Sequence, residues 1–307
     1  ILSIVELSKI LTKTACLKPF FLPINAPIKS LTEEYIVSSN GAFFRILLKK
    51  ALIGLLITND PMNPIKIIEN IISSGADIIE IGVPFSDPMS EGPVIQLSHE
   101  RSLKNKTSLE EILKLSKRLK KKFNKTPIVL MGYFNTFINS LEIAKGNHDI
   151  NDDICKELKN HGVDGLIIVD LPFEESEEIY NKLTEFDIDL IRLISPTTND
   201  LRINEILSNS SGFIYYVSLK GITGAEIDSF NALKERVESI KKSSRIPVVV
   251  GFGIKDKKTA KKMSVFSDGV VVGSAIVDII SNKHDLHFQD IFSQISKFVE
   301  GIKSSIQ

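Results

Sequence analysis

Residues 78–93 read IIEIGVPFSDPMSEGP, and they contain both a clear strand and the clearest candidate acid of the sequence. The first six residues are apolar or glycine apart from Glu80, a pattern typical of a strand buried on both faces. The Pro- and Gly-rich residues that follow predict a loop. Burying an unpaired carboxylate is costly or makes the group hold its proton. We therefore interpret Glu80 as a candidate acid or base at a strand end, with a solvent-facing glutamate on a strand edge as the alternative.

Seven further apolar runs repeat this arrangement along the chain. Runs this apolar predict strands of a parallel sheet, and the segments between them have helical periodicity. The eight runs span residues 51–58, 78–83, 127–131, 165–169, 189–193, 213–217, 247–251 and 269–273. The helical patterns span residues 64–74, 108–124, 150–161, 175–184, 201–208, 229–243, 257–264 and 288–304.

Eight strand–helix units predict an α/β fold, a (β/α)8 TIM barrel with an eight-stranded parallel barrel and outer helices. A doubly wound open sheet is the alternative, but no GxGxxG follows the first strand. In a closed barrel the active site lies at the carboxyl ends of the strands. The loops after the strands are therefore expected to carry the chemistry.

The first part of the chain does not join this alternation. Residues 1–30 contain four lysines but only one acid, Glu6. We expect residues 1–39 to form an N-terminal extension, either poorly ordered or a targeting segment, and residues 40–307 to form the catalytic barrel domain.

Composition narrows the possible partners and compartments. The 38 basic and 38 acidic residues give a formal net charge of zero, so no basic excess favours nucleic acid or an anionic membrane. No apolar run is long enough for a transmembrane helix. Cys16 and Cys155 form no CxxC pattern and the five histidines form no HExxH, so no disulfide framework and no metal site are expected. A cytoplasmic location fits, with a plastid or other organelle as the alternative if residues 1–39 are a targeting segment.

Glycines at the ends of the last two predicted strands indicate an anion site. Residues 251–253 (GFG) follow the seventh strand and residues 273–274 (GS) follow the eighth. In barrels the loops after these strands commonly bind phosphate, because glycine lets backbone N–H groups approach an anion and a helix start adds a favourable dipole. The loop at 218–225 is interpreted as a lid in which Gly224 adds another amide, with a plain surface loop as the alternative.

Five segments of the chain, taken in order, resemble one known family. They read IEIGVPFSDPMSEGP, VDGLIIVDLPFEES, GFIYYVSLKGITGAE, VVGFGI and DGVVVGSAIV. In this order they resemble the tryptophan synthase alpha subunit family over residues 45–280. The glycine motifs alone are not specific, whereas the first and third segments together are highly specific.

This resemblance implies a lyase of tryptophan biosynthesis. Members of the family cleave indole-3-glycerol phosphate to indole and glyceraldehyde 3-phosphate in a retro-aldol step. Indole then passes to a beta subunit within an α2β2 heterotetramer. The alpha subunit itself needs no cofactor, so pyridoxal phosphate is expected only in the partner beta subunit.

The resemblance also implies roles for individual residues. Glu80 and Glu91 take the positions of the two catalytic carboxylates, Glu80 as the acid–base group and Glu91 as the hydrogen-bond partner of the indole nitrogen. Substrate and phosphate binding is expected at Tyr215, Thr223, Gly224, Phe252, Gly253, Gly273 and Ser274. The surface facing the beta subunit is expected to include Pro84, Asp87 and Asn135.

Two departures from the family pattern keep alternatives open. The family has Asp where this chain has Glu91, and a misplacement of about 1 Å can cost roughly 10²-fold in rate. In the first strand, Leu55 and Ile57 replace an aromatic residue and a threonine. The alternatives are a catalytically weakened alpha-like subunit that binds and activates a beta subunit, or another phosphate-binding TIM-barrel enzyme such as a sugar-phosphate isomerase.

Overall fold

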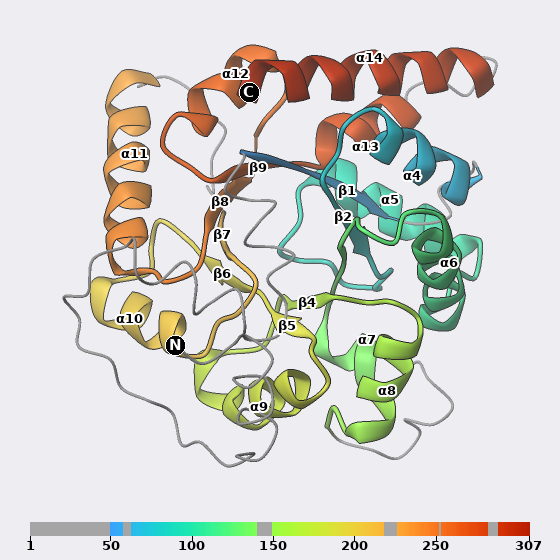
Figure 1. Ribbon diagram of the computed structural model, residues 1–307, viewed down its shortest axis with the longest axis horizontal. Coiled ribbons are helices and arrows are strands. Elements are labelled where there is room, and N and C mark those ends of the chain that lie inside the picture. The colour runs from blue at the N-terminus through green and yellow to red at the C-terminus, as the bar shows by residue number, and fades with distance from the viewer. Residues whose placement is uncertain (1–49, 58–62, 140–148, 218–225, 252, 282–287) are drawn as a thin grey trace, which may run out of the picture. The chain divides into compact units, whose positions relative to one another are not determined.

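The computed structural model describes residues 50–57, 63–139, 149–217, 226–251, 253–281 and 288–307. Within these ranges the strands form one central sheet and the helices lie around it (Figure 1). The N-terminal extension expected at residues 1–39 lies outside the described residues, so the domain boundary stays a prediction. None of the helices in the described ranges is long and apolar enough to span a membrane.

The sheet in the described residues has nine strands, and every neighbouring pair in it is parallel. Their order across the sheet is β5-β4-β3-β2-β1-β9-β8-β7-β6. The strands are β1 (Ala51–Ile57), β2 (Ile78–Gly82), β3 (Ile128–Gly132), β4 (Gly165–Ile168), β5 (Asp189–Leu190), β6 (Arg192–Ile194), β7 (Ile214–Val217), β8 (Val248–Gly251) and β9 (Gly269–Val272). All eight predicted runs are strands, and the fifth run is divided into β5 and β6.

The barrel closes at this division. β5 and β6 are the two ends of the strand order, yet only Ile191 separates them in the chain. The Ile191 N–H still donates to the Leu166 carbonyl of β4 at 2.9 Å. The break is therefore a local interruption within one barrel strand. The result is a nearly closed barrel, which confirms the predicted (β/α)8 fold.

In the described ranges, the helices include the eight predicted ones and three that were not predicted. The predicted ones are α4 (Pro64–Ser73), α6 (Leu109–Lys122), α8 (Asp152–Asn160), α9 (Glu177–Glu185), α10 (Asp200–Ser208), α11 (Glu226–Ser243), α12 (Lys257–Ser264) and α14 (Phe288–Ile306). The others are α5 (Pro93–Lys104), α7 (Phe134–Asn139) and α13 (Ser274–Ser281). α6 begins at a capping box, in which the Ser108 hydroxyl accepts the Glu111 N–H and the Glu111 carboxylate accepts the Ser108 N–H.

Side chains alternate along each strand between two apolar cores. Ile78 and Val129 belong to a buried cluster inside the barrel. Their neighbours Ile79 and Leu130 belong to the larger cluster between the strands and the helices. Since strand side chains alternate with a period of two, Glu80 points to the same side as Ile78. The fold therefore directs the candidate acid into the barrel interior.

Three aspartates fix the amino ends of the strands, and we call them the aspartate clamps. Asp77, Asp164 and Asp268 immediately precede β2, β4 and β9. Each carboxylate accepts a hydrogen bond from a backbone N–H of the neighbouring strand. Each also forms an ion pair with a lysine of a helix. The N–H donors are Leu52 (2.8 Å), Ile128 (2.7 Å) and Val248 (2.9 Å). The lysines are Lys303 (2.6 Å), Lys120 (2.7 Å) and Lys241 (2.6 Å).

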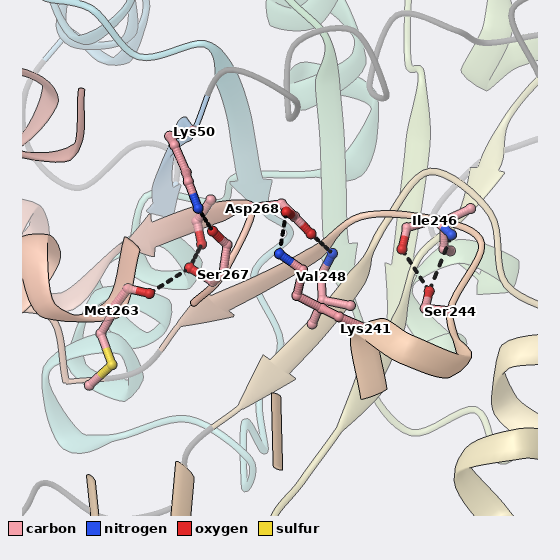
Figure 2. Close-up of polar contacts among 9 residues, drawn as sticks. Lys50, Lys241, Ser244, Ile246, Val248, Met263, Ser267 and Asp268 are labelled. Carbon is pink, nitrogen blue, oxygen red and sulfur yellow. Dashed lines mark hydrogen bonds and ion pairs between the residues drawn. The ribbon is translucent and has the colours of Figure 1, made fainter. Parts of the chain in front are cut away.

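The clamp at Asp268 is drawn in Figure 2. One carboxylate oxygen accepts from Lys241 Nζ at 2.6 Å and the other accepts from the Val248 N–H at 2.9 Å. Beside them, Lys50 Nζ donates to the Ser267 carbonyl at 2.5 Å. Because each oxygen of Asp268 has its own donor, this clamp holds β8 and β9 in register without leaving a carboxylate oxygen unpartnered.

Candidate active site

β2 carries Glu80 into the barrel, where its side chain is 0 % exposed. Both carboxylate oxygens are buried, and neither has a hydrogen-bond partner among the described residues. Burial raises the pKa of Glu80 to about 8, because the charged form loses its hydration. The glutamate is therefore buried, and the alternative of a solvent-facing side chain does not hold.

Tyr215 on β7 faces the same interior. Burial raises the pKa of Tyr215 well above its ordinary value, and the nearby charge of Glu80 raises it further. The tyrosine ring lies over Gly251 of β8, where an added Cβ would collide with the ring and its hydroxyl. Gly251 thus makes room for the aromatic side chain. The next residue, Tyr216, belongs to the outer core, as the strand alternation requires.

Glu91 lies in the loop between β2 and α5 and is half-buried. The Tyr133 hydroxyl donates to Glu91 Oε2 at 2.6 Å and itself accepts the Ser90 N–H at 3.1 Å. Burial raises the pKa of Glu91, while the hydrogen bonds from Tyr133 and from backbone N–H groups oppose that rise. Burial and the Glu91 hydrogen bond raise the pKa of Tyr133 to about 12. Tyr133 therefore stays protonated and holds the carboxylate.

The sequence did not single out Tyr133. The available signal was its position, because Tyr133 follows β3 directly and so lies at the carboxyl end of the barrel. Its partner Glu91 is 42 residues away in the chain, and that pairing is visible only in the folded protein.

The phosphate site predicted after β8 and β9 lies partly within the described residues. Gly251 of β8 pairs with Val271 of β9, so Gly253 and Gly273 follow adjacent strands at the same level. Gly253 has a φ of +78°, and nothing lies within 4 Å of the position that a Cβ would take. Ser274 is the first residue of α13, and two N–H groups of that helix donate to the Gly273 carbonyl at 2.9 and 3.0 Å. An open glycine turn after β8 and the start of α13 after β9 thus follow neighbouring strands.

Three of the predicted binding residues, Thr223, Gly224 and Phe252, lie outside the described residues, and their roles stay predictions. The predicted interface residues differ in exposure. Asp87 and Asn135 are exposed, whereas Pro84 is buried within this chain. A contact made by Pro84 would therefore act through the shape of its loop.

The two carboxylates at this end of the barrel differ in environment. Glu80 has no hydrogen-bond partner among the described residues and favours the protonated form, whereas Glu91 is held by a phenol and by backbone N–H groups. Two acids in unlike surroundings can divide a proton donation from the stabilisation of a positive charge. Within the described ranges, no group of three or more His, Cys, Asp or Glu residues could hold a metal ion. Acid–base enzymes of the TIM-barrel class are built in this way, at the carboxyl ends of the strands.

Comparison with known proteins defines the family. The sequence model of the family "Tryptophan synthase alpha chain" matches residues 47–307. The tryptophan synthase alpha chain of Marinobacter nauticus is 42% identical over 235 residues, which cover 76% of this chain and 84% of the relative. The structure of tryptophan synthase subunit alpha from Legionella pneumophila has a TM-score of 0.75 at 31% identity and covers 86% of this chain and 98% of its own. A chain of the tryptophan synthase complex from Pyrococcus furiosus has a TM-score of 0.70 at 32% identity, covering 83% and 98%.

The chain belongs to the tryptophan synthase alpha chain family. It is a lyase of the tryptophan synthase type, as the resemblance of its five segments predicted. The readings as an unrelated phosphate-binding barrel and as a doubly wound sheet are thereby set aside.

Proposed function

We propose that this chain cleaves indole-3-glycerol phosphate to indole and glyceraldehyde 3-phosphate. The observation that carries the proposal is Glu80, a fully buried glutamate whose oxygens have no hydrogen-bond partner in the described part of the chain. Such a group destabilises the fold unless it holds a proton, and its pKa of about 8 provides a proton donor at neutral pH. Family membership gives the reaction in which that donor is used.

In the proposed reaction Glu80 transfers protons twice. The protonated acid first gives its proton to C3 of the indole ring, which leaves Glu80 as a carboxylate and the ring as a cation. The carboxylate then takes the proton of the carbinol hydroxyl while the bond from C3 to the carbinol carbon breaks. The electron pair of that bond restores the aromatic ring, the carbinol carbon becomes the aldehyde, and Glu80 is again protonated.

Glu91 is proposed to accept a hydrogen bond from the ring N–H. Positive charge builds on this nitrogen when C3 is protonated, and a fixed carboxylate stabilises it. The 2.6 Å bond from Tyr133 supports this role, because it orients Glu91 before the substrate binds. The ring itself receives the electrons of the breaking bond, so we propose that the step needs no cofactor of this chain.

The phosphate group is proposed to bind where β8 and β9 end. Gly253 offers an open backbone turn. Gly273 precedes α13 and Ser274 begins it, and the N-terminal amides and dipole of this helix favour an anion. Gly224 and the lid residue Thr223 are proposed to complete the site, with Tyr215 and Phe252 lining the indole and glycerol part of the pocket.

We further propose a partner, a beta subunit that uses pyridoxal phosphate and consumes the indole in an α2β2 complex. The likeness to a chain of the Pyrococcus furiosus tryptophan synthase complex supports an assembly of this kind. Asp87 and Asn135 are exposed and are the contacts that we propose for it, with Pro84 shaping their loop. The cytoplasm is the proposed location, since two cysteines without a CxxC pattern suit a reducing compartment.

Indole release from indole-3-glycerol phosphate tests the proposal, measured with and without a beta subunit. We expect release by the chain alone and faster release in the complex. Folded protein that releases no indole in either assay would contradict the proposed activity.

A second function is favoured by one observation, the extra methylene of Glu91 relative to the family's Asp. A weakened subunit that mainly activates its partner would gain activity when Glu91 is shortened. We therefore propose Glu91→Asp as the discriminating variant. Loss of activity supports a pocket built around the longer acid, and a large gain supports the weakened subunit.

A further inference from the structure

His99 holds the backbone of the loop that carries Glu91. It lies on α5, and its side chain is buried, with 2 % of its surface exposed. The ring nitrogen Nδ1 accepts the Phe85 N–H at 3.0 Å. Burial lowers the pKa of His99 to about 4, so the ring is neutral near pH 7 and Nδ1 is free to accept. Its Nε2 has no partner among the described residues, which leaves Nδ1 as the atom through which the ring acts.

Contacts lead from this hydrogen bond to the carboxylate. The Phe85 ring stacks on the Tyr133 ring, with centroids 4.5 Å apart and planes at 17°. The Tyr133 hydroxyl donates to Glu91 Oε2 at 2.6 Å. A second α5 residue, Gln96, donates to the Glu91 carbonyl at 2.9 Å. Helix α5 therefore contacts both ends of the loop.

The loop is not fully packed against α5. A cavity of about 340 Å³ lies there, lined among others by Phe85, Met89 and His99. Met89 is 82 % exposed, so its side chain does not fill the cavity. Because open space separates part of the loop from α5, the hydrogen bonds with His99 and Gln96 keep the loop in position.

We propose that His99 is a positioning residue for the lyase reaction, which sets the place of the Glu91 carboxylate through Phe85 and Tyr133. The inference rests on the proposed function, and it adds a residue that the sequence did not indicate. The effect is large enough to measure, because a shift of about 1 Å in a catalytic group can cost roughly 10²-fold in rate.

The variants separate the Nδ1 acceptor from the mere bulk of the ring. In His99→Asn the amide oxygen takes the place of Nδ1 and can accept the Phe85 N–H. In His99→Gln the amide lies near the place of Nε2 instead, and His99→Leu removes every acceptor. His161→Asn serves as the matched control, because His161 directly follows α8, at the opposite end of the barrel.

The readout is steady-state release of indole from indole-3-glycerol phosphate. We expect His99→Leu and His99→Gln to lower kcat by about tenfold or more, with KM within about threefold because phosphate binding is untouched. His99→Asn should restore kcat to within about threefold of the parent, and the control should match the parent. Equal activity of the Asn and Gln variants, or full activity of the Leu variant, would overturn the proposal. If the Leu variant does not fold, the Asn and Gln pair still decides.

A double-mutant cycle tests the route through Tyr133. If His99 acts through Tyr133, adding His99→Leu to Tyr133→Phe lowers kcat less than the product of the two single effects. Multiplicative effects would show that the two residues act independently and would contradict the route.

A measurement without substrate separates this proposal from the proposed function. The chain contains no tryptophan, so Phe85→Trp introduces a single reporter stacked on Tyr133. In this background we expect His99→Leu to shift the emission to the red and His99→Asn to leave it in place. If the parent releases no indole but the emission shifts as expected, the proposed function fails while the hold of His99 on the loop stands. An unchanged emission in the Leu variant would sink the inference.

Discussion

At the amino ends of the strands, Asp77, Asp164 and Asp268 each accept a backbone N–H and pair with a lysine. Inside the barrel, Glu80 in the middle of β2 has neither kind of partner among the described residues. The three aspartates therefore serve register and stability, whereas Glu80 is an acid whose ionisation the fold opposes. The comparison shows that the aspartates stabilise the fold, whereas the buried Glu80 lowers its stability at the position where the chemistry is expected.

The largest expected effect comes from removing the acid inside the barrel, Glu80. Glu80→Gln keeps the size of the side chain but cannot exchange the proton, and general acid–base catalysis is worth about 10²–10⁴-fold. We expect indole release to fall by about 10³-fold while the free energy of unfolding stays equal or rises. Activity assays and urea unfolding measure the two quantities. A variant that unfolds more easily would show that Glu80 serves the fold.

The pH dependence of stability should report on the same group. The folded pKa of Glu80 is about 8 against an ordinary 4.5, so the folded state binds the proton more tightly than the unfolded state. The contribution of the protonated Glu80 to the free energy of unfolding is therefore complete below the ordinary pKa. It is lost as the pH rises through about 8. Asp189, whose pKa burial raises to about 7, acts in the same direction.

We therefore expect the unfolding free energy of the parent to fall between about pH 5 and pH 8, and less so in Glu80→Gln. Denaturant titrations across this range measure it. Parallel pH profiles for the two proteins would contradict the assigned proton.

The next effect tests the aspartate clamps. Asp164→Ala removes the acceptor of the Ile128 N–H and the partner of Lys120, and charge-assisted hydrogen bonds of this kind are worth about 1.5–3 kcal/mol. We expect the free energy of unfolding, measured with urea, to fall by this amount. Activity per folded molecule should stay within about twofold of the parent, because the candidate active site lies at the other end of the barrel.

Asp153→Asn provides the matched control for Asp164→Ala. Asp153 pairs with Lys156 on the exposed surface of α8, and its loss should leave stability unchanged within error. If the two substitutions lower the free energy of unfolding equally, the aspartate clamps are no stronger than ordinary surface ion pairs.

The smallest expected effect comes from Tyr133→Phe. The substitution removes one donor to Glu91 and should lower kcat by about tenfold, the value of one hydrogen bond near 1.4 kcal/mol. Losing this bond also raises the pKa of Glu91, so the acidic limb of the kcat profile should move to higher pH. A profile that does not move would mean that Tyr133 does not govern the ionisation of Glu91.

Much of the barrel could be predicted because its signals are local. Each of the eight runs is a short β-branched or aliphatic segment, and the isolated Glu80 is visible within one of them. α5, α7 and α13 were missed for different reasons. α5 mixes apolar with polar residues after Pro93, α7 has only six residues, and α13 reads SAIVDIIS, which is nearly as apolar as a strand.

The candidate site was predictable only in part, because its pairings are distant in sequence. The carboxylate of Glu91 and its loop were found from the motif, but its partner Tyr133 and the support from His99 depend on the fold. The clamps were missed for the same reason, since Asp77 and Lys303 are 226 residues apart. The division of the fifth strand at Ile191 has no sequence signal that we can name.

The clamp at Asp77 also sets an order of events during synthesis. Its lysine comes from α14, the last helix of the described residues, and the Phe292 carbonyl of the same helix accepts a hydrogen bond from the Asn70 amide of α4. The segments of β1 and β2 leave the ribosome long before Lys303 is translated. Until then the Asp77 carboxylate has no lysine partner. An mRNA truncated before the Lys303 codon would yield a chain in which Asp77, between β1 and β2, lacks its lysine partner.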